Sequence, residues 1–344
     1  MKRSLAWSLG WSVVVAVIGV ACSGGHGRSG GGGAAPESSG TGAPEATGTG
    51  RGGTLSLKGS DTMVILAQRF AEGYMHAHEG VTIQVSGGGS GTGIAALLDG
   101  TTDIADSSRP ISERETADLQ TRQHAAPHET RVAIDALAVY VNQASTVQSL
   151  SLDELQQIFT GAVTNWSAVG GPDAPIVLYS RENSSGTYAY FKEHVLHGGD
   201  FAAQAQTLPG TAAVINAISH DPNGIGYGGI GYAEGVRVLP VSSGGEPVEP
   251  TMENALSGSY PISRYLFMYT AGEPSGLAAD FLTWVVSPEG QAFVEQAGYY
   301  PLPREGAGTA PAPTTAPADP AAPAPTDPAP AAPATTVPQE AASS

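Results

Sequence analysis

The chain has 344 residues, long enough for two ordinary domains, and Gly (46) and Pro (26) together exceed a fifth of it. Charged residues are only 14%, a balance that predicts a folded centre with unfolded ends. The 32 Asp and Glu outnumber 15 Lys and Arg, giving a net charge of −17 that argues against nucleic-acid binding, because duplex affinity comes mostly from cationic contacts to phosphates. The single Cys excludes an internal disulfide and a Cys-based zinc cluster.

Residues 1–21 are typical of an export signal. Lys2 and Arg3 are followed by an apolar run at residues 11–20, which is too short to span a bilayer. The segment ends at Cys22 and resembles a bacterial lipoprotein signal, in which the cysteine becomes the lipidated first residue. Gly19 departs from the aliphatic residue usual at its position. An ordinary signal with a chance cysteine is the alternative; we favour lipidation because the only thiol stands where the signal ends.

Two low-complexity segments flank the predicted folded part. Residues 22–53 are mostly Gly, Ser, Ala, Thr and Pro and predict a flexible, disordered tether. Residues 304–344 carry ten Pro among Ala and Thr and predict an extended, disordered tail. Residues 54–303 between them contain 10 Lys and Arg against 26 Asp and Glu, so the acidity belongs to the folded part.

Strand and helix patterns alternate through this folded part. The predicted strands are residues 54–58, 81–85, 103–105, 131–141, 176–179 and 261–269. The first predicted helix has one face marked by Thr62, Leu66, Phe70 and Tyr74. The other predicted helices are residues 94–98, 151–159, 187–196, 277–286 and 288–297. Ser151 and Glu154 form a capping box, and Ser287 stands before Pro288 as an N-cap. The alternation favours an α/β architecture with largely parallel sheets, in two lobes.

Four polar turns share one local pattern, in which a strand is followed by small polar residues and usually by the start of a helix. They are residues 58–62, 86–93, 106–110 and 180–187. Helix N-termini favour anions, glycines let the backbone approach a ligand, and ligands of α/β sheets lie at the carboxyl ends of strands. Arg109 and Arg181 lie in two of these turns and offer the planar donors that suit an oxyanion. Simple helix caps and surface ion pairs are the alternative, but four such turns together indicate an anion site.

Motifs for other chemistries fail in their details. Gly91-Thr92-Gly93 begins a loose dinucleotide pattern, but no strand ending in Asp or Glu follows at the required distance. No Lys-Ser/Thr follows the glycine run, and Thr92 stands where a Gly-x-Ser-x-Gly motif needs its second Gly. His194 and His197 could face one way on a helix, but no acidic or sulfur ligand completes a metal site with them, and solvated surface histidines are the alternative. We therefore expect no catalytic residue, no metal and no cofactor.

At the four polar turns the sequence resembles the phosphate-binding lipoproteins of bacterial phosphate-specific ABC transporters, in their short form. The resemblance runs in order through essentially all of residues 54–303. The matching stretches are residues 59–63, 85–97, 103–109, 158–161, 164–166, 180–187, 224–227 and 260–264.

The resemblance implies a two-lobed type II periplasmic-binding-protein fold that closes on phosphate by a hinge, with mixed, mainly parallel sheets. Lobe one would be residues 54–138 plus 258–303, and lobe two residues 139–257. The ligand contacts carried over by motif position are Ser60, Asp61, Thr62, Ser90, Gly91, Thr92, Ser108 and Arg109 from lobe one, and Arg181, Ser185, Gly186 and Thr187 from lobe two.

One residue departs from the long-form phosphate binders, which place an Asp where this chain has Ser108. That Asp accepts a proton from the ligand and helps to reject sulfate. In this chain Asp61 is the first candidate for the proton acceptor and Asp106 is the second.

The function that the resemblance implies is a monomeric receptor that captures inorganic phosphate and delivers it to ABC permease subunits. It would be lipid-anchored in the cell envelope, facing the periplasm or the extracellular side. The alternatives are a receptor for sulfate or arsenate and an envelope phosphate sensor. A phosphate-ester hydrolase is disfavoured, because no base lies beside a binding-turn Ser and neither Arg turn has a His or Lys partner.

Overall fold

The computed structural model describes residues 52–303. The predicted signal peptide (1–21), the lipidation at Cys22, the tether up to residue 51 and the tail (304–344) lie outside the described residues.

The described chain begins with three strand-then-helix units. Strands β1 (Gly53–Gly59), β2 (Val81–Ser86) and β3 (Ile104–Ser107) are parallel, with β1 between the other two. They are followed by α1 (Val64–Ala77), α2 (Ser90–Leu98) and α3 (Glu113–Gln123). Leu66, Phe70 and Tyr74 of the predicted helix face are buried along α1, whereas Thr62, the fourth predicted member, lies in the turn before the helix begins.

The chain continues through β4 and a second set of strands and helices. The elements are β4 (Pro127–Val141), β5 (Leu150–Ser151), α4 (Leu152–Phe159), η1 (Trp166–Val169), β6 (Val177–Arg181), α5 (Gly186–His194), β7 (Gln206–Leu208), α6 (Gly210–His220), β8 (Gly224–Gly229), η2 (Ile230–Tyr232), β9 (Arg237–Leu239), β10 (Val241–Ser242) and α7 (Met252–Leu256). The last elements are β11 (Ser263–Ala271), α8 (Gly276–Val286) and α9 (Pro288–Gln296).

The main sheet is mixed. Its order is β2-β1-β3-β11-β4-β8-β6-β7, with β9 also paired to β4. The outer pairs β2-β1-β3 and β8-β6-β7 are parallel, whereas β11 and β4 pair antiparallel with each other and with their neighbours. The predicted α/β class is therefore confirmed, with antiparallel strands at the centre of the sheet.

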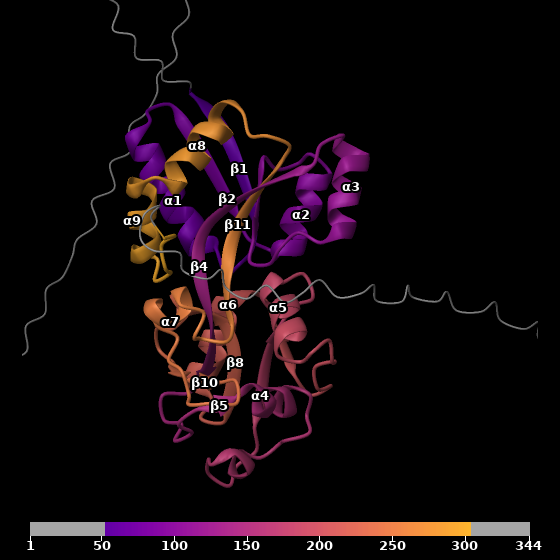
Figure 1. Cartoon of the computed structure of the whole chain (residues 1–344), viewed down its shortest axis with the longest axis vertical. Coiled ribbons are helices and arrows are strands. Elements are labelled where there is room, and N and C mark those ends of the chain that lie inside the picture. The colour runs from indigo at the N-terminus through magenta and orange to yellow at the C-terminus, as the bar shows by residue number, and fades with distance from the viewer. Residues whose placement is uncertain (1–51, 304–344) are drawn as a thin grey trace, which may run out of the picture. The chain divides into compact units, whose positions relative to one another are not determined.

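Two large hydrophobic cores share β4. Val132 and Ala133 pack in the first core with residues of α1, α8 and α9, while Leu137, Val139 and Val141 pack in the second with residues of α4 and α5. Figure 1 shows β4 and β11 running from the group of α1, α8 and α9 toward the group of α4, α5 and β8. Residues 132–141 of β4 are all buried, as the apolar pattern of the sequence predicts.

No helix within residues 52–303 is both long enough and apolar enough to cross a membrane.

Candidate anion-binding site

Five buried side-chain hydroxyls meet at one point, and we call them the hydroxyl cluster. Its members are Ser60, Thr62, Ser90, Ser108 and Thr187, each at most 2% exposed. Ser108 Oγ lies 2.9 Å from Ser60 Oγ and 3.4 Å from both Ser90 Oγ and Thr187 Oγ1, while Thr187 Oγ1 lies 2.7 Å from Thr62 Oγ1. Each hydroxyl can donate one hydrogen bond and accept others, so an anion oxygen can replace a neighbouring hydroxyl as the acceptor.

The parallel strands bring the cluster together. Ser60 and Thr62 follow β1, Ser90 opens the helix after β2, and Ser108 follows β3, so all come from the same edge of the sheet. Ser60 N–H donates to the carbonyl of Asp106 at 2.9 Å, which ties the first turn to the third. A Cβ on Gly59 would collide with this same Asp106 backbone, so only glycine allows the approach.

The N-termini of α2 and α5 face this point from opposite sides. Gly91 N–H donates to the carbonyl of Ser184 at 2.9 Å, and Ser185 caps α5 by accepting from Tyr188 N–H at 3.2 Å. A Cβ on Gly186 would lie 2.8 Å from Ser108 Oγ and closer still to Ser90 Oγ. Figure 1 shows α5 below α2 in the view. Two helix N-termini aimed at one set of hydroxyls favour negative charge there.

The sequence places helix α2 later than the structure does. The pattern predicts a helix over residues 94–98, but α2 begins at Ser90, after Gly89 with a φ of 94°. Glycine has a low helix propensity, so Gly91 and Gly93 make this first turn look unlike a helix in the sequence. Gly93 is required because a Cβ there would collide with the carbonyl of Lys58 on β1. Ser90, Gly91 and Thr92 therefore form the first turn of a helix and not a loop before it.

Arg181 lies beside the cluster as a buried cation, 1% exposed. Its Nη2 donates to Asp61 Oδ2 at 3.0 Å and its Nη1 to Thr211 Oγ1 at 2.9 Å, while its Nε has no hydrogen-bond partner within residues 52–303. Burial lowers the pKa of Arg181, and the charge of Asp61 opposes that shift. A buried guanidinium with an unused donor is suited to an oxyanion.

Asp61, the first candidate for the proton acceptor, is already engaged at both oxygens. Its Oδ2 accepts from Arg181, and its Oδ1 accepts from Gly88 N–H at 2.8 Å. Asp106, the second candidate, is 2% exposed, and its Oδ1 has no hydrogen-bond partner within the described part of the chain. Burial raises the pKa of Asp106 to about 7.

Two predicted contacts are not brought into the cluster. Arg109 donates from Nη1 and Nη2 to the Glu115 carboxylate at 2.8 and 2.7 Å, and from Nη1 to the Pro110 carbonyl at 2.9 Å. Glu115 also forms the capping box of α3 with Ser112, so this carboxylate holds Arg109 at the surface of the helix start. Thr92 Oγ1 donates to the Gly88 carbonyl at 2.6 Å. The ion pair that the sequence left open as the alternative for Arg109 is the one observed.

The structure adds two residues that sequence reasoning missed, Arg264 and Asp135. Arg264 Nη2 donates to Thr187 Oγ1 at 2.9 Å, and Nε and Nη2 both donate to Asp135 Oδ2 at 3.1 and 2.9 Å. Arg264 is 3% exposed and Asp135 is fully buried. The available signals were a lone Asp inside the apolar run at residues 131–141 and an Arg in the stretch 260–264.

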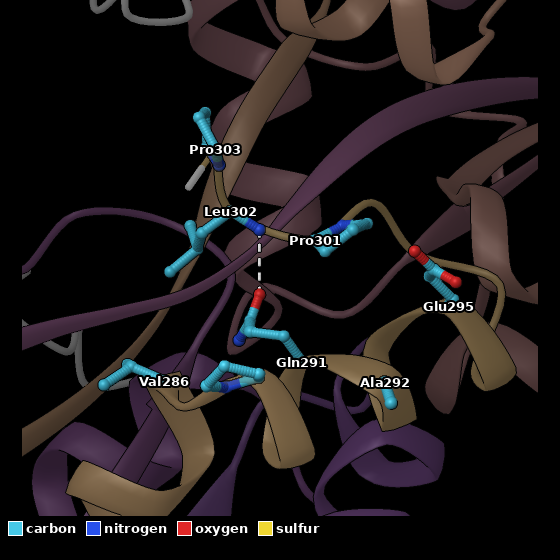
Figure 2. Close-up of a pocket in the computed structure, with 8 residues that line it drawn as sticks. Val286, Gln291, Ala292, Glu295, Pro301, Leu302 and Pro303 are labelled. Atoms are coloured by element: carbon cyan, nitrogen blue, oxygen red, sulfur yellow. Dashed lines mark hydrogen bonds between the residues drawn. The ribbon is translucent and has the colours of Figure 1, made fainter. Parts of the chain in front are cut away.

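A separate groove lies between α8, α9 and the end of the described chain (Figure 2). It is lined by Val286, Pro288, Gln291, Ala292, Glu295, Pro301, Leu302 and Pro303. Leu302 N–H donates to Gln291 Oε1 at 2.8 Å across it. None of the hydroxyl-cluster residues lines this groove, and no cation among residues 52–303 lines it, so it is not the candidate anion site.

Comparisons with known proteins show the family to which the chain belongs. Residues 43–289 match the model of the PBP superfamily domain. The phosphate-binding protein PstS of Pseudomonas aeruginosa is 36% identical over 270 residues, which cover 73% of this chain and 84% of that protein. The phosphate-binding protein PstS of Bacillus subtilis is 36% identical over 251 residues, covering 73% of this chain and 81% of that protein.

Solved structures show the same fold. A candidate phosphate ABC transporter substrate-binding protein from Clostridium perfringens, solved with bound phosphate, is 28% identical with a TM-score of 0.67, covering 73% of this chain and all of that one. An ABC-type phosphate transport receptor from Vibrio cholerae is 28% identical with a TM-score of 0.60, covering 72% and 100% of the two chains. The chain therefore belongs to the PBP superfamily and, within it, to the PstS family of substrate-binding proteins, with their two-lobed α/β fold.

Proposed function

We propose that this chain captures inorganic phosphate at the hydroxyl cluster and delivers it to the permease of an ABC transporter. The observation that carries the proposal is the meeting of five buried hydroxyls, two helix N-termini and the buried Arg181 at one point. These groups can surround a tetrahedral anion with short-range donors. The relatives named as phosphate-binding proteins and the Clostridium perfringens structure with bound phosphate support this ligand.

The proposed contacts come from both lobes. We assign direct roles to Ser60, Thr62, Ser90, Ser108, Arg181, Ser185, Gly186 and Thr187, with Asp61 acting through Arg181. Gly91 instead holds the two helix starts together, because its N–H is bonded to the Ser184 carbonyl. Residues 54–138 with 258–303 form lobe one in this proposal, and residues 139–257 form lobe two. The Thr62–Thr187 and Asp61–Arg181 contacts then cross between the lobes, so that closing the lobes completes the site.

Calorimetric titration with phosphate tests the proposal. Ser108→Ala removes the hydroxyl at the centre of the cluster, and we expect its phosphate affinity to fall by roughly 10-fold or more, since a hydrogen bond to a charged group contributes about 1.5–3 kcal/mol. Ser257→Ala is the matched control, because Ser257 is exposed and bonds only to its own loop. Absence of binding heat for the unmodified protein at millimolar phosphate would contradict the proposed ligand.

Sulfate is the second candidate ligand, and one observation favours it. Selection against sulfate needs an acceptor for a ligand proton. Each oxygen of Asp61 already accepts one hydrogen bond, and Asp106, whose Oδ1 has no partner within residues 52–303, has a pKa raised to about 7 by burial, so it is partly protonated near neutral pH. The same titration with sulfate and arsenate separates the cases. Because arsenate resembles phosphate in shape and protonation, we expect it to compete with phosphate. Sulfate binding as tight as phosphate binding would make the chain a general oxyanion receptor.

The setting that we propose is the cell envelope, on the side facing the periplasm or the extracellular space, with Cys22 carrying a lipid anchor and the chain acting as a monomer without enzymatic activity. The support is the order of apolar run and single cysteine at the N-terminus. One acyl chain holds a protein weakly, whereas several hold it firmly. Cys22→Ala should therefore move the protein from the washed membrane fraction to the soluble fraction. A variant that stays with the membranes would rule out anchoring through this cysteine.

A further inference from the structure

Arg264 is a buried cation that the proposed contacts leave without a role. It stands second in β11 and opposite Asp135 of β4 in the sheet register, at the place where both strands pass between the two cores. Asp135 Oδ2 accepts from Nε and Nη2 of Arg264, and Asp135 Oδ1 accepts from Ile230 N–H at 3.0 Å. The carboxylate is thus bonded at both oxygens and fixes the plane of the guanidinium.

The same guanidinium reaches the hydroxyl cluster. Nη2 has two hydrogens, of which one is directed to Asp135 and the other to Thr187 Oγ1 at 2.9 Å. A hydroxyl that accepts from a guanidinium must send its own hydrogen elsewhere. For Thr187 the nearest acceptors are Thr62 Oγ1 at 2.7 Å and Ser108 Oγ at 3.4 Å. Arg264 therefore makes Thr187 a donor toward the centre of the cluster.

The remaining donor atom of the Arg264 guanidinium, Nη1, is buried and has no hydrogen-bond partner within residues 52–303. The Arg264 guanidinium carbon lies 5.1 Å from the centre of the Tyr190 ring, and Tyr190 in turn donates to the carbonyl of Ser263 at 2.9 Å. A buried guanidinium donor without an acceptor is costly in a folded protein, which argues that the position serves a ligand and not stability alone.

We infer that Arg264 is a positioning residue of the anion site, which holds Thr187 Oγ1 as a hydrogen-bond donor to the bound anion. The inference rests on the proposed function, because it needs an anion at the hydroxyl cluster. Asp135 neutralises the charge of Arg264, so the contribution of Arg264 is the direction of a hydrogen bond and not net positive charge. Arg181 supplies the charge from the other side of the site.

A double-mutant cycle with phosphate titration tests this inference. Arg264→Lys keeps the charge beside Asp135, but a single ammonium lacks the rigid fork that reaches both Asp135 and Thr187. We expect Arg264→Lys to weaken phosphate binding about 10-fold and Thr187→Val to weaken it by at least as much. If Arg264 acts through the Thr187 hydroxyl, the double variant binds no more weakly than Thr187→Val alone. Thr187→Ser, which keeps the hydroxyl, should retain the full effect of Arg264→Lys.

The outcomes distinguish a failure of this inference from a failure to fold and from a failure of the proposed function. Affinity losses that multiply in the double variant would show that Arg264 acts on the protein in general and would overturn the inference. If Arg264→Lys does not fold, Asp135→Asn releases the guanidinium from its anchor and must show the same dependence on the Thr187 hydroxyl. An unmodified protein that binds no phosphate would refute the proposed function itself. The control is Arg131→Lys, since Arg131 is half exposed on β4 beside Glu129 and should change affinity less than twofold.

Discussion

Two arginines that look alike in the sequence differ in the structure because of their partners. Arg109 and Arg181 both lie in Ser-rich turns after strands. Glu115, six residues after Arg109, forms a two-bonded pair with it at the start of α3, where both side chains are about one-fifth exposed. Arg181 is paired with a carboxylate 120 residues away and is buried. Only the second arrangement leaves a desolvated cation available to a ligand.

This difference predicts opposite outcomes for the two alanine variants. Removing one partner of a buried charged pair costs about 2–5 kcal/mol, so Arg181→Ala should weaken phosphate binding by roughly 30-fold or more. Arg109→Ala should change it less than threefold, since a pair near the surface contributes about 0–1 kcal/mol. Calorimetric titration of both variants checks the pair, and equal losses would contradict the assignment.

Asp106 makes the free energy of unfolding fall as the pH rises. Its pKa is about 7 in the folded protein against an ordinary value of 3.8. Because the folded state holds this proton more tightly than the unfolded state, the stability that depends on this group falls as the pH rises from about 4 to about 7. Three pKa units at about 1.4 kcal/mol each give a destabilisation of about 4 kcal/mol at pH 8.

The variant Asp106→Asn removes this titration. At each pH we compare the free energy of unfolding of the variant with that of the unmodified protein. We expect this difference, variant minus unmodified protein, to be about 2–3 kcal/mol larger at pH 8 than at pH 5. Denaturant unfolding at both pH values measures the difference, and the cost of burying an amide cancels because that cost does not change with pH. A gain that is the same at both pH values would mean that Asp106 is not the titrating group.

At the scale of elements, the site depends on how closely α5 approaches α2. Gly186 has no side chain, and an added Cβ would strike Ser90 Oγ and Ser108 Oγ. Gly186→Ala should therefore push the two helix starts apart and weaken phosphate binding about 10-fold or more, as a displacement of donors by a few tenths of an ångström affects every contact in the site.

Gly245→Ala is the matched control for this approach. Gly245 has open space at its Cβ position and a backbone conformation that alanine adopts, so its affinity should not change. Titration of both variants with phosphate, together with circular dichroism to verify folding, makes the comparison. Unchanged affinity in Gly186→Ala would show that the close approach of α2 and α5 is not needed for binding.

Local signals explain which elements the sequence predicts. Helices α4 and α9 carry their caps in the sequence, and the structure forms the capping box at Ser151 and the cap at Ser287 as predicted. Helix α3 has a capping box but only one buried residue, Leu119, so its apolar period is too weak to reveal it. Helix α6 has buried Thr211, Val214 and Ile218 at helical spacing, a pattern that indicates a helix although α6 is not among the predicted elements.

The candidate site residues also divide into those that local sequence reveals and those that only the fold brings together. Ser60, Thr62, Ser90, Ser108 and Thr187 were found because each lies in a polar turn that can be recognised from its neighbours. Arg264 could not be found by that route, since its partner Asp135 is 129 residues away and strand pairing alone brings them together. The resemblance to a family supplied motifs, whereas contacts between distant strands required the fold.

For the whole molecule, an acidic protein must hold an anion against its own field. Residues 54–303 carry 26 acidic and 10 basic residues, so the long-range potential repels phosphate. Binding then depends on short-range donors in the hydroxyl cluster and on Arg181. Salt screens exposed charges beyond about 8–10 Å but screens buried contacts much less. The repulsion should therefore weaken with salt while the buried contacts persist.

We accordingly expect the association rate for phosphate to stay constant or rise slightly as ionic strength increases from low to physiological values. The dissociation rate should change little over the same range. Stopped-flow measurements in a salt series provide the check. A steep fall in association rate would indicate attractive steering and an electropositive approach to the site, contrary to the composition.

The two cores differ in how their residues are spread along the chain, and this sets the order in which they can be completed. All the buried residues of the second core fall within residues 134–262, a single continuous stretch. The first core joins Leu55 and Leu57 near the start of the described chain to Phe281 and Val294 near its end. During synthesis the first core cannot form until nearly the whole chain has been made. The second core can form earlier, because all its buried residues lie within residues 134–262.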